Sequence, residues 1–344
     1  MPLATRPPAA LDATMTHTAS FSGVLDAARQ IAGAAVRTPL IESPALNTHL
    51  GGRVLIKAET LQVAGAFKFR GAFNRISRLT DAEKARGVVA YSSGNHAQAV
   101  AAAAKRMGTS AIIVMPADSP RVKVEGVIAF GGEVRSYDRW SESREAIGEE
   151  IARTRGSVLV RPFDDPFIIE GQGTCGLEIL EQADSPIDQL LCGASGGGLI
   201  AGINLAFAER SPATRVLAVE PAAYDDTRRS LEAGERMTYP PGAAPSICDA
   251  LMSDRPGELT FPINRRLSGV LTVTDAEVAE AVRYAFRTLK LVVEPGGAVS
   301  LAALLAGRVE TAGRTTAIVL SGGNIDPALF AAIIEDRFTP GAPE

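Results

Sequence analysis

Residues 88–115 read VVAYSSGNHAQAVAAAAKRMGTSAIIVM, and this stretch indicates the fold class of the whole chain. It begins with a short apolar run, continues through an alanine-rich segment from Ala97 to Met107, and ends in a second apolar run at 111–115. Short apolar runs are typical of buried strands, and the alanine-rich segment is typical of a helix. Two strands joined by a helix predict a βαβ unit, in which the strands run parallel.

The same alternation extends toward both ends of the chain. Further short apolar strands are predicted at 54–59, 132–136, 158–160, 190–192, 216–219 and 317–320. Helices are predicted at 21–32, 67–76, 141–154, 275–289 and 327–335, and in segments that end near 178 or begin at 199 and 298. Strands that alternate with helices need crossover connections, which favours an α/β fold with two open parallel-sheet lobes. Because such sheets bind ligands beyond the carboxyl ends of their strands, we expect the site in the cleft between the lobes.

Length and composition exclude several classes of protein. The 344 residues suffice for about two domains. The formal charge of −4 arises from 35 basic and 39 acidic residues that are interspersed, which argues against a nucleic-acid or anionic-membrane partner. No apolar stretch is long enough to span a bilayer, and the first sixteen residues lack the apolar core of a signal peptide. We expect a cytoplasmic protein with reduced cysteines that acts on a small molecule.

A lysine between two aromatic residues is the first candidate for chemistry. Lys68 lies in the run AFKFRG at 66–71, where small and aromatic neighbours are placed to remove water from its ammonium group. Desolvation lowers the pKa of a lysine and frees its amine to form an imine with an aldehyde. The run SSGNHAQ at 92–98 follows after one short helix and one strand. This pairing predicts an enzyme that depends on pyridoxal 5′-phosphate.

A glycine-rich run, CGASGGGL at 192–199, joins a predicted strand to a predicted helix. Several backbone N–H groups can converge at such a helix N-terminus and hold a phosphate. Turns of this kind also serve plain strand-to-helix packing, and the run departs from the dinucleotide and Walker fingerprints. Beside Lys68 and the loop at 92–98, phosphate binding is the favoured interpretation.

The chain resembles the fold-type II pyridoxal-phosphate enzymes, which share the fold of the tryptophan synthase β chain. It is similar in particular to the group of serine/threonine dehydratases (threonine ammonia-lyases), serine racemases and 3-hydroxyaspartate dehydratases. The resemblance rests on eight segments that occur in order: KAE at 57–59 with Gln62, 66–71, 92–98, EGQGT at 170–174, the glycine loop at 196–198, VEP at 219–221, VEPGGA at 293–298 and LSGGN at 320–324. It implies a large cofactor-binding domain (1–80 and 156–335), a small mobile domain (81–155), and disordered tails at 1–18 and 339–344.

The resemblance implies a role for each residue that would contact the cofactor. Lys68 would form the imine and later remove the substrate's α-proton, and Phe67 would pack on the cofactor ring. Asn95 would bond the phenolic oxygen, and Ser321 would face the pyridine nitrogen, where a neutral hydroxyl suits elimination better than transamination. The phosphate would be held by the backbone of Ser195, Gly196, Gly197 and Gly198.

The resemblance also implies where the substrate binds. Ser92, Asn95 and His96 would receive the substrate carboxylate, and Arg144 would approach it from a helix start. His96 has the alternative of a structural hydrogen bond, and Arg144 that of an exposed ion pair with Glu145. Ser93 resembles the serine that acts on the opposite cofactor face in serine racemases, which leaves racemisation open as a side reaction.

A segment after one predicted strand, EPAAYDD at 220–226, resembles a divalent-cation site. Its ligands would be the carboxylates of Glu220 and Asp226 and the backbone carbonyl of Tyr224, and such hard oxygen ligands suit Mg²⁺ or Ca²⁺. The alternative is a solvated acidic turn in which Asp225 or Asp226 caps the next helix.

Taken together, these features predict an ammonia-lyase that converts L-threonine or L-serine to a 2-oxo acid and ammonia, and the resemblance implies a homodimer. The alternatives are a 3-hydroxyaspartate dehydratase or an amino-acid racemase, and more remotely a non-catalytic cofactor-binding protein. Arg161 stands where relatives usually carry histidine. It would either bind a second substrate carboxylate or pair with Asp164 or Asp165, and the pairing is the favoured interpretation.

Overall fold

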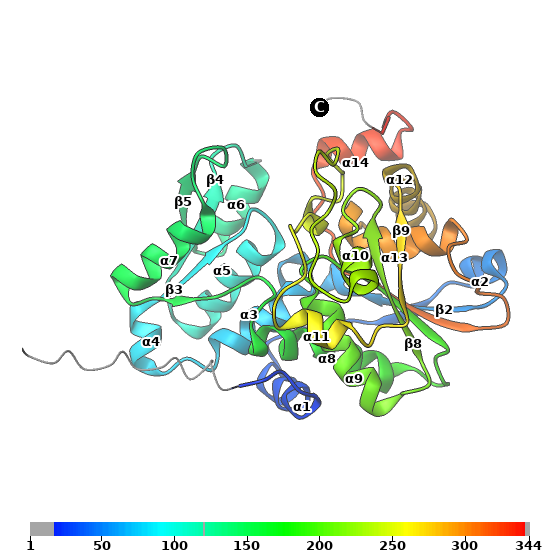
Figure 1. Ribbon diagram of the computed structural model, residues 1–344, viewed down its shortest axis with the longest axis horizontal. Coiled ribbons are helices and arrows are strands. Elements are labelled where there is room, and N and C mark those ends of the chain that lie inside the picture. The colour runs from blue at the N-terminus through cyan, green and yellow to red at the C-terminus, as the bar shows by residue number, and fades with distance from the viewer. Residues whose placement is uncertain (1–16, 120, 341–344) are drawn as a thin grey trace, which may run out of the picture.

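The computed structural model describes residues 17–119 and 121–340, which form helices and strands in alternation (Figure 1). The strands are β1 (Leu40–Glu42), β2 (Arg53–Ala58), β3 (Val88–Tyr91), β4 (Ala111–Pro116), β5 (Glu133–Tyr137), β6 (Val158–Leu159), β7 (Gln189–Gly193), β8 (Arg215–Pro221), β9 (Gly269–Val273) and β10 (Thr315–Leu320). The helices are α1 (Phe21–Gln30), α2 (Pro44–Leu50), α3 (Lys68–Ile76), α4 (Asp81–Arg86), α5 (Asn95–Met107), α6 (Arg121–Ala129), α7 (Arg144–Arg155), α8 (Pro166–Gln182), α9 (Gly198–Arg210), α10 (Asp226–Ala233), α11 (Thr260–Asn264), α12 (Asp275–Tyr284), α13 (Pro295–Leu305) and α14 (Pro327–Ile334).

The strands form two sheets. One has six strands in the order β1-β2-β10-β7-β8-β9, and the other has four in the order β5-β4-β3-β6. All neighbouring strands are parallel except β1, which pairs with β2 in the antiparallel sense. Figure 1 shows the four-stranded sheet and its helices on the left and the six-stranded sheet on the right. The predicted α/β class with two largely parallel sheets is confirmed.

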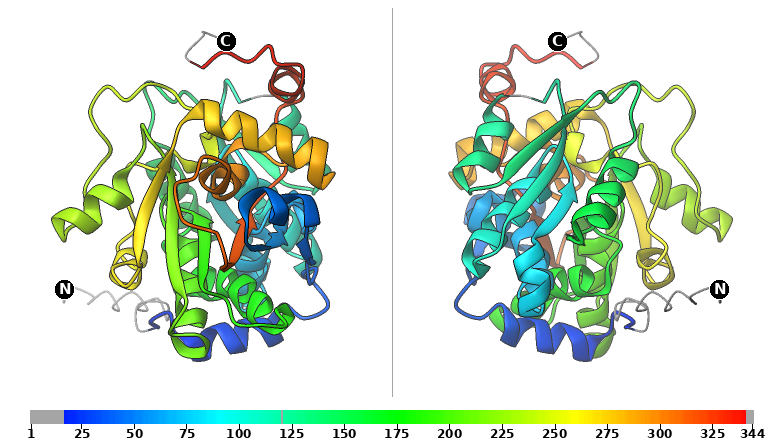
Figure 2. Two further views of the ribbon diagram at one scale, coloured as in Figure 1. Left: turned by 90° about the vertical axis from the view of Figure 1, so that its right-hand side faces the viewer. Right: turned by 90° about the vertical axis from the view of Figure 1, so that its left-hand side faces the viewer.

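Both faces of each sheet are covered, as parallel sheets require. Along β10, Ala317 and Val319 face the core formed with α8 and α9, whereas Ile318 and Leu320 face the core formed with α12 and α13. Successive side chains of a strand point to opposite faces, so an unbroken apolar run fills both cores. Figure 2 shows α1 (dark blue) on the outer side of the green helices α8 and α9, and α1 contacts both of them.

Helices α3, α8 and α9 pack with their backbones in close approach. A methyl group added at Gly202 of α9 would lie 2.3 Å from the Ile169 carbonyl oxygen of α8. One added at Gly171 of α8 would lie 2.6 Å from the Cα of Gly71 on α3. Only glycine fits at these contacts, and the tight stack places the first residues of α3 and α9 at one cavity.

Two sequence predictions need correction or completion. The disordered N-terminal tail predicted at 1–18 extends too far, because His17 is ordered: its Nε2 donates to Glu170 Oε1 at 2.9 Å, and its ring stacks on Phe167. Residues 1–16 and 341–344 lie outside the described part of the chain. The domain division at 155/156 stays a prediction. It assigns β6 to the larger domain, although this strand pairs with β3 of the four-stranded sheet.

Two further findings concern sequence-based expectations. The three cysteines are free and buried. Within residues 17–119 and 121–340, no helix combines the length and apolar character needed to cross a membrane.

Candidate active site

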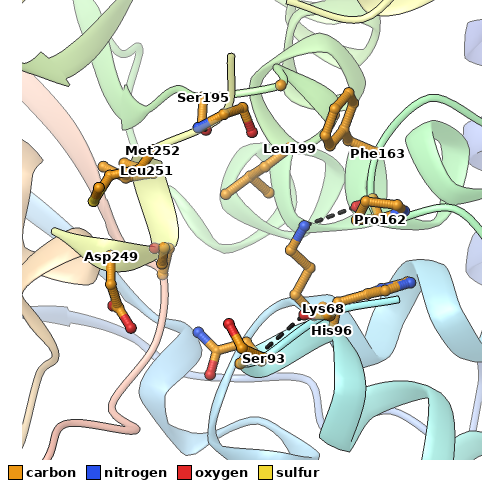
Figure 3. Close-up of a pocket in the computed structure, with 18 of the residues that line it drawn as sticks. Lys68, Ser93, His96, Pro162, Phe163, Ser195, Leu199, Asp249, Leu251 and Met252 are labelled. Carbon is orange, nitrogen blue, oxygen red and sulfur yellow. Dashed lines mark hydrogen bonds between the residues drawn. The ribbon is translucent and has the colours of Figure 1, made fainter. Parts of the chain in front are cut away.

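One cavity lies at the carboxyl ends of β3, β6, β7 and β10, where the loops after these strands converge (Figure 3). Every residue predicted to contact the cofactor or the substrate lines it: Phe67, Lys68, Ser92, Ser93, Asn95, His96, Arg144, Ser195, Gly196, Gly197, Gly198 and Ser321. These residues come from segments spread over more than two hundred positions of the sequence. The structure therefore brings the whole predicted set together, while the role of each residue stays a prediction.

Lys68 is the first residue of α3, and its half-buried side chain lines this cavity. Its Nζ donates to the Pro162 carbonyl oxygen at 2.7 Å and lies 5.2 Å from the centre of the Phe67 ring (Figure 3). Burial lowers the pKa of Lys68 to about 8, although the nearby Glu294 carboxyl opposes the shift. An amine with this pKa is partly neutral near pH 7 and can act as a nucleophile or a base.

The glycine loop between β7 and α9 has its carbonyl groups turned to the protein. The Gly196 carbonyl accepts from Thr260 Oγ1 at 2.6 Å, and the Gly197 carbonyl accepts from Asn264 Nδ2 at 3.3 Å. Within the described residues, the backbone N–H groups of 195–199 have no protein acceptor.

The loop also leaves no room for side chains. Gly197 has φ +90°, and a methyl group at Gly196 would lie 2.4 Å from the Phe163 ring. Free N–H groups at a helix N-terminus fit an anion, so the loop fits the phosphate of pyridoxal phosphate.

Asn95, at the start of α5, takes part in a chain of side-chain hydrogen bonds. Its Nδ2 donates to Glu294 Oε1 at 2.5 Å, and its Oδ1 accepts from Asn324 Nδ2 at 2.7 Å. Burial raises the pKa of Glu294 to about 8, and the negative charge of Asp249 adds to the shift. Glu294 and Asn324 also line the cavity, in the VEPGGA and LSGGN segments that carried the family resemblance, but sequence reasoning gave neither a role.

His96 is fully buried and neutral. Its Nε2 lies 3.0 Å from the Val160 carbonyl oxygen, which can only accept, so this nitrogen carries the proton. Nδ1 is then an acceptor and has no partner among the described residues. Burial and the charge of Lys68 lower the pKa of His96 to about 3. This arrangement favours the structural alternative over the binding of a carboxylate, which needs a donor.

Arg144 combines both of its predicted environments. Its Nε donates to Glu145 at 2.7 Å, while its guanidinium lines the cavity 5.8 Å from the Tyr91 ring.

Arg161 does not form the favoured ion pair with Asp164 or Asp165, because both carboxylates bond other groups. Asp165 bonds Arg75 at 3.1 Å, and Asp164 accepts the backbone N–H groups of Glu258 and Leu259. Arg161 is exposed and lies near the Tyr91 hydroxyl, where its charge opposes the rise in the pKa of Tyr91 that burial causes. It does not line the cavity.

The predicted metal segment lies at the end of β8. Glu220 accepts the N–H groups of Thr227 and Arg228 at the start of α10, and Asp225 pairs with Arg228 and Arg229. Both carboxylate oxygens of Asp226 are buried and have no partner in the described part of the chain. No cluster of three His, Cys, Asp or Glu side chains suited to a metal occurs among residues 17–119 and 121–340. Glu220, Asp226 and the Tyr224 carbonyl offer the hard oxygen atoms that Mg²⁺ or Ca²⁺ prefers, and a cation at these residues stays a prediction.

Comparison with known proteins identifies the family. The family model described as "Pyridoxal-phosphate dependent enzyme" matches residues 31–322. The chain is 41% identical to an L-threo-3-hydroxyaspartate ammonia-lyase of Pseudomonas sp over 317 residues, which cover 92% of this chain and 98% of that protein. It is 42% identical to a serine racemase of Arabidopsis thaliana over 296 residues, which cover 84% and 88% of the two chains.

A solved structure agrees with these relatives. A threonine deaminase of T.th. superposes with a TM-score of 0.84 at 43% sequence identity, covering 89% of this chain and 99% of that chain. The resemblance drawn from the eight sequence segments is thus confirmed. The chain belongs to the family of pyridoxal-phosphate dependent enzymes, in its fold-type II group, and its cofactor is pyridoxal 5′-phosphate.

Proposed function

We propose that this protein is an ammonia-lyase that converts a small β-hydroxy amino acid, L-threonine or L-serine, to a 2-oxo acid and ammonia. The similar proteins named as threonine deaminase and hydroxyaspartate ammonia-lyase support this reaction class. One structural observation carries the proposal. The half-buried amine of Lys68, whose pKa desolvation lowers to about 8, shares a cavity with a glycine loop whose N–H groups have no protein acceptor among the described residues.

The cofactor would be held by residues of this cavity. The N–H groups of 195–198 would bind its phosphate, Asn95 would bond its phenolic oxygen, Phe67 would pack on its ring, and Ser321 would face its pyridine nitrogen. When bound, pyridoxal phosphate withdraws electrons from the substrate's α-carbon and makes the α-proton acidic. Ser321 is itself held in place, since its carbonyl accepts the Phe67 N–H at 3.0 Å.

Lys68 would supply the proton transfer. Its neutral amine would accept the α-proton of the substrate, whose carboxylate would lie against Ser92 and Arg144. Loss of the β-hydroxyl breaks the bond between the β-carbon and oxygen, and the hydroxyl leaves with a proton as water. The released enamine takes up water and hydrolyses, so the overall products are a 2-oxo acid and ammonia. His96 would hold the loop after β6 through Val160.

The test is release of ammonia and a 2-oxo acid from L-threonine and L-serine by purified, cofactor-loaded protein. The wild-type protein should release both products in equal amounts, and Lys68→Ala should release neither. Arg121→Met is a matched control, because Arg121 is exposed and pairs with Glu125 on its own helix. Equal turnover by Lys68→Ala and the wild type would refute the proposal.

Ser93 favours racemisation as a second activity of the same site. Its side chain lines the cavity that contains Lys68, and the Arabidopsis relative is a serine racemase. D-Serine should form from L-serine and carry deuterium at the α-carbon in D₂O, and Ser93→Ala should remove this product more strongly than ammonia release. If Ser93→Ala changed both equally, Ser93 would have no separate role.

A divalent cation at Glu220, Asp226 and the Tyr224 carbonyl is also part of this proposal. It is supported by the two buried Asp226 oxygens, because buried polar atoms are rarely left without a partner. After chelation, added Ca²⁺ or Mg²⁺ should raise the melting temperature of the wild type and leave that of Asp226→Asn unchanged. Equal responses of the two proteins would rule the site out.

Assembly, domain motion and cellular location complete the proposal. We expect a homodimer, to which the exposed apolar side chains of Phe286 and Val292 would contribute contact area, and sedimentation would measure its mass. Residues 81–155 would form the smaller domain and close on the cofactor domain. The free cysteines suit the cytoplasm.

A further inference from the structure

Lys123 and Asp249, which both line the cavity, form an ion pair. Lys123 lies on α6, beside the four-stranded sheet, and Asp249 begins the short helical turn Asp249–Leu251 next to α13. Both residues line the same cavity as Lys68, and Figure 3 labels Asp249 on the side of the cavity opposite Pro162. Sequence reasoning assigned a role to neither residue. Lys123 belongs to no recognisable sequence motif, and its partner Asp249 lies 126 positions away in the sequence.

The two partners differ in their access to water. The side chain of Lys123 is 17% exposed, whereas that of Asp249 is 55% exposed. A largely buried ammonium is costly without an anion beside it, but an exposed carboxylate returns to water at little cost. The pair is therefore asymmetric. Asp249 can leave when another carboxylate takes its place, while Lys123 needs an anionic partner throughout.

The position of Lys123 relates it to the reacting centre. Its helix packs on α5, where a methyl group at Gly126 would lie 2.9 Å from the side chain of Gln98. Lys123, Lys68 and Glu294 all line the cavity, and the charges of both lysines oppose the rise in the pKa of Glu294 that burial causes. Arg144, another cation that lines the cavity, lies beside Tyr91 and pairs with Glu145.

We propose that Lys123 binds the second carboxylate of a β-hydroxy dicarboxylic amino acid, such as 3-hydroxyaspartate, and that Asp249 occupies this subsite until the substrate arrives. The inference rests on the proposed lyase function and extends its substrate class. The α-carboxylate would bind at Ser92 and Arg144, and the distal carboxylate would displace Asp249 from Lys123. Substrates without a second carboxylate would leave the Lys123–Asp249 pair closed.

The first experiment compares inhibitors that cannot lose a β-hydroxyl. Binding of L-aspartate and of its uncharged isostere L-asparagine is followed by the change in absorbance of the bound cofactor, which needs no turnover. The wild type should bind L-aspartate about 10- to 100-fold more tightly, as expected for a charge-assisted contact. Lys123→Met should remove this preference, and Asp249→Asn should strengthen it. Arg121→Met, on the same helix, should keep the wild-type ratio.

The second experiment compares kcat/KM for 3-hydroxyaspartate with that for L-serine. In Lys123→Met the ratio should fall about 10- to 100-fold, mainly through KM. An equal loss with both substrates would mean that Lys123 binds the α-carboxylate or is structural, which would overturn the inference. No change in kcat/KM with either substrate would overturn it as well.

The two proposals fail in different ways. Ammonia release from L-serine or L-threonine, with no wild-type preference for L-aspartate over L-asparagine, would overturn the role of Lys123 and leave the lyase function standing. If no β-hydroxy amino acid released ammonia, the lyase function would fall, and the aspartate and asparagine titrations would still decide whether Lys123 binds a carboxylate.

Discussion

Lys57, which is buried, and Lys68, which is half-buried, lie eleven residues apart in the sequence and differ in what surrounds their amines. Lys57 of β2 donates to the Thr38 carbonyl at 2.7 Å, to Glu178 at 2.6 Å and to Gln182 at 2.8 Å. These three acceptors use all three of its N–H bonds. The amine of Lys68 has one acceptor in the described structure, the Pro162 carbonyl.

The difference extends to the neighbouring charges. Glu178 also bonds Arg70, which in turn bonds Glu59, so two buried cations and two acids compensate one another. Lys68 forms no ion pair with a carboxylate of residues 17–119 and 121–340, and Glu294, the nearby acid, bonds Asn95 instead. Full compensation makes a buried charge part of the scaffold, whereas a desolvated amine without a counter-charge is available for chemistry.

Removal of the Lys68 amine should have the largest effect. Lys68→Ala should lower ammonia release by about 10³-fold or more, because a positioned base alone contributes roughly 10²- to 10⁴-fold. It should also abolish the visible absorbance of the imine that the lysine forms with the cofactor. Lys57→Met should retain this absorbance when folded, and its loss there would show that the two lysines do not differ as described.

Removal of the Lys57 amine should instead reduce stability. Lys57→Met leaves Glu178 with one cation and should lower the free energy of unfolding by about 3–5 kcal/mol, the range for a broken buried pair. Urea unfolding would measure it. The control is Arg37→Met, which breaks the exposed pair with Glu181 and should cost about 0–1 kcal/mol. Equal costs would contradict the scaffold role.

Glycine at 197 should be required for cofactor binding. Gly197→Ala forces an alanine to φ +90° and brings its methyl group to 2.5 Å from Asn264 Nδ2. The backbone strain at residue 197 and the displacement of Asn264 should together cost about 1–3 kcal/mol of binding free energy, which weakens cofactor affinity about tenfold or more. Gly234→Ala has φ +77° with open space around it, so it isolates the backbone strain. Unchanged affinity in Gly197→Ala, measured by cofactor titration, would exclude the loop as the phosphate site.

The smallest change is the dependence of stability on pH, taken over a step of one pH unit. The folded protein lowers the pKa of Lys68 from 10.5 to about 8, so between these values the unfolded chain binds more protons than the native one. Stability of the cofactor-free wild type should therefore rise with pH from 8 to 10.5, by at most about 1.4 kcal/mol per pH unit, relative to Lys68→Met. Parallel stability curves for the two proteins would mean that the Lys68 amine is not desolvated.

Much of the architecture could be predicted from local patterns. The strands of both sheet centres and the long helices were found because their apolar residues repeat with the period of each structure. The antiparallel strand β1 and the partly exposed edge strand β9 were missed, because three to five residues carry little pattern. Helix α6 was missed because it contains three valines and Gly126, and it is packed against α5.

The site divides in the same way. Lys68, Asn95 and the glycine loop lie in runs whose composition already indicates their chemistry. The sequence alone gives Glu294 no role beyond its place in the VEPGGA motif, because its burial and its hydrogen bond to Asn95 depend on the fold. Lys123 and Asp249 carry no local signal, and the predicted pairs of Arg161 were wrong because Asp164 and Asp165 bond other groups. Partners that come from distant segments appear only when the chain is folded.

The most direct measurement is borohydride reduction of the cofactor-loaded protein followed by peptide mass mapping. Reduction attaches the cofactor permanently to the lysine that binds it, and the chain offers six lysines. The added mass should lie on Lys68, with none on Lys57. Attachment to another lysine, or no attachment to a protein that binds the cofactor, would contradict the claim that Lys68 is the reactive amine of this fold.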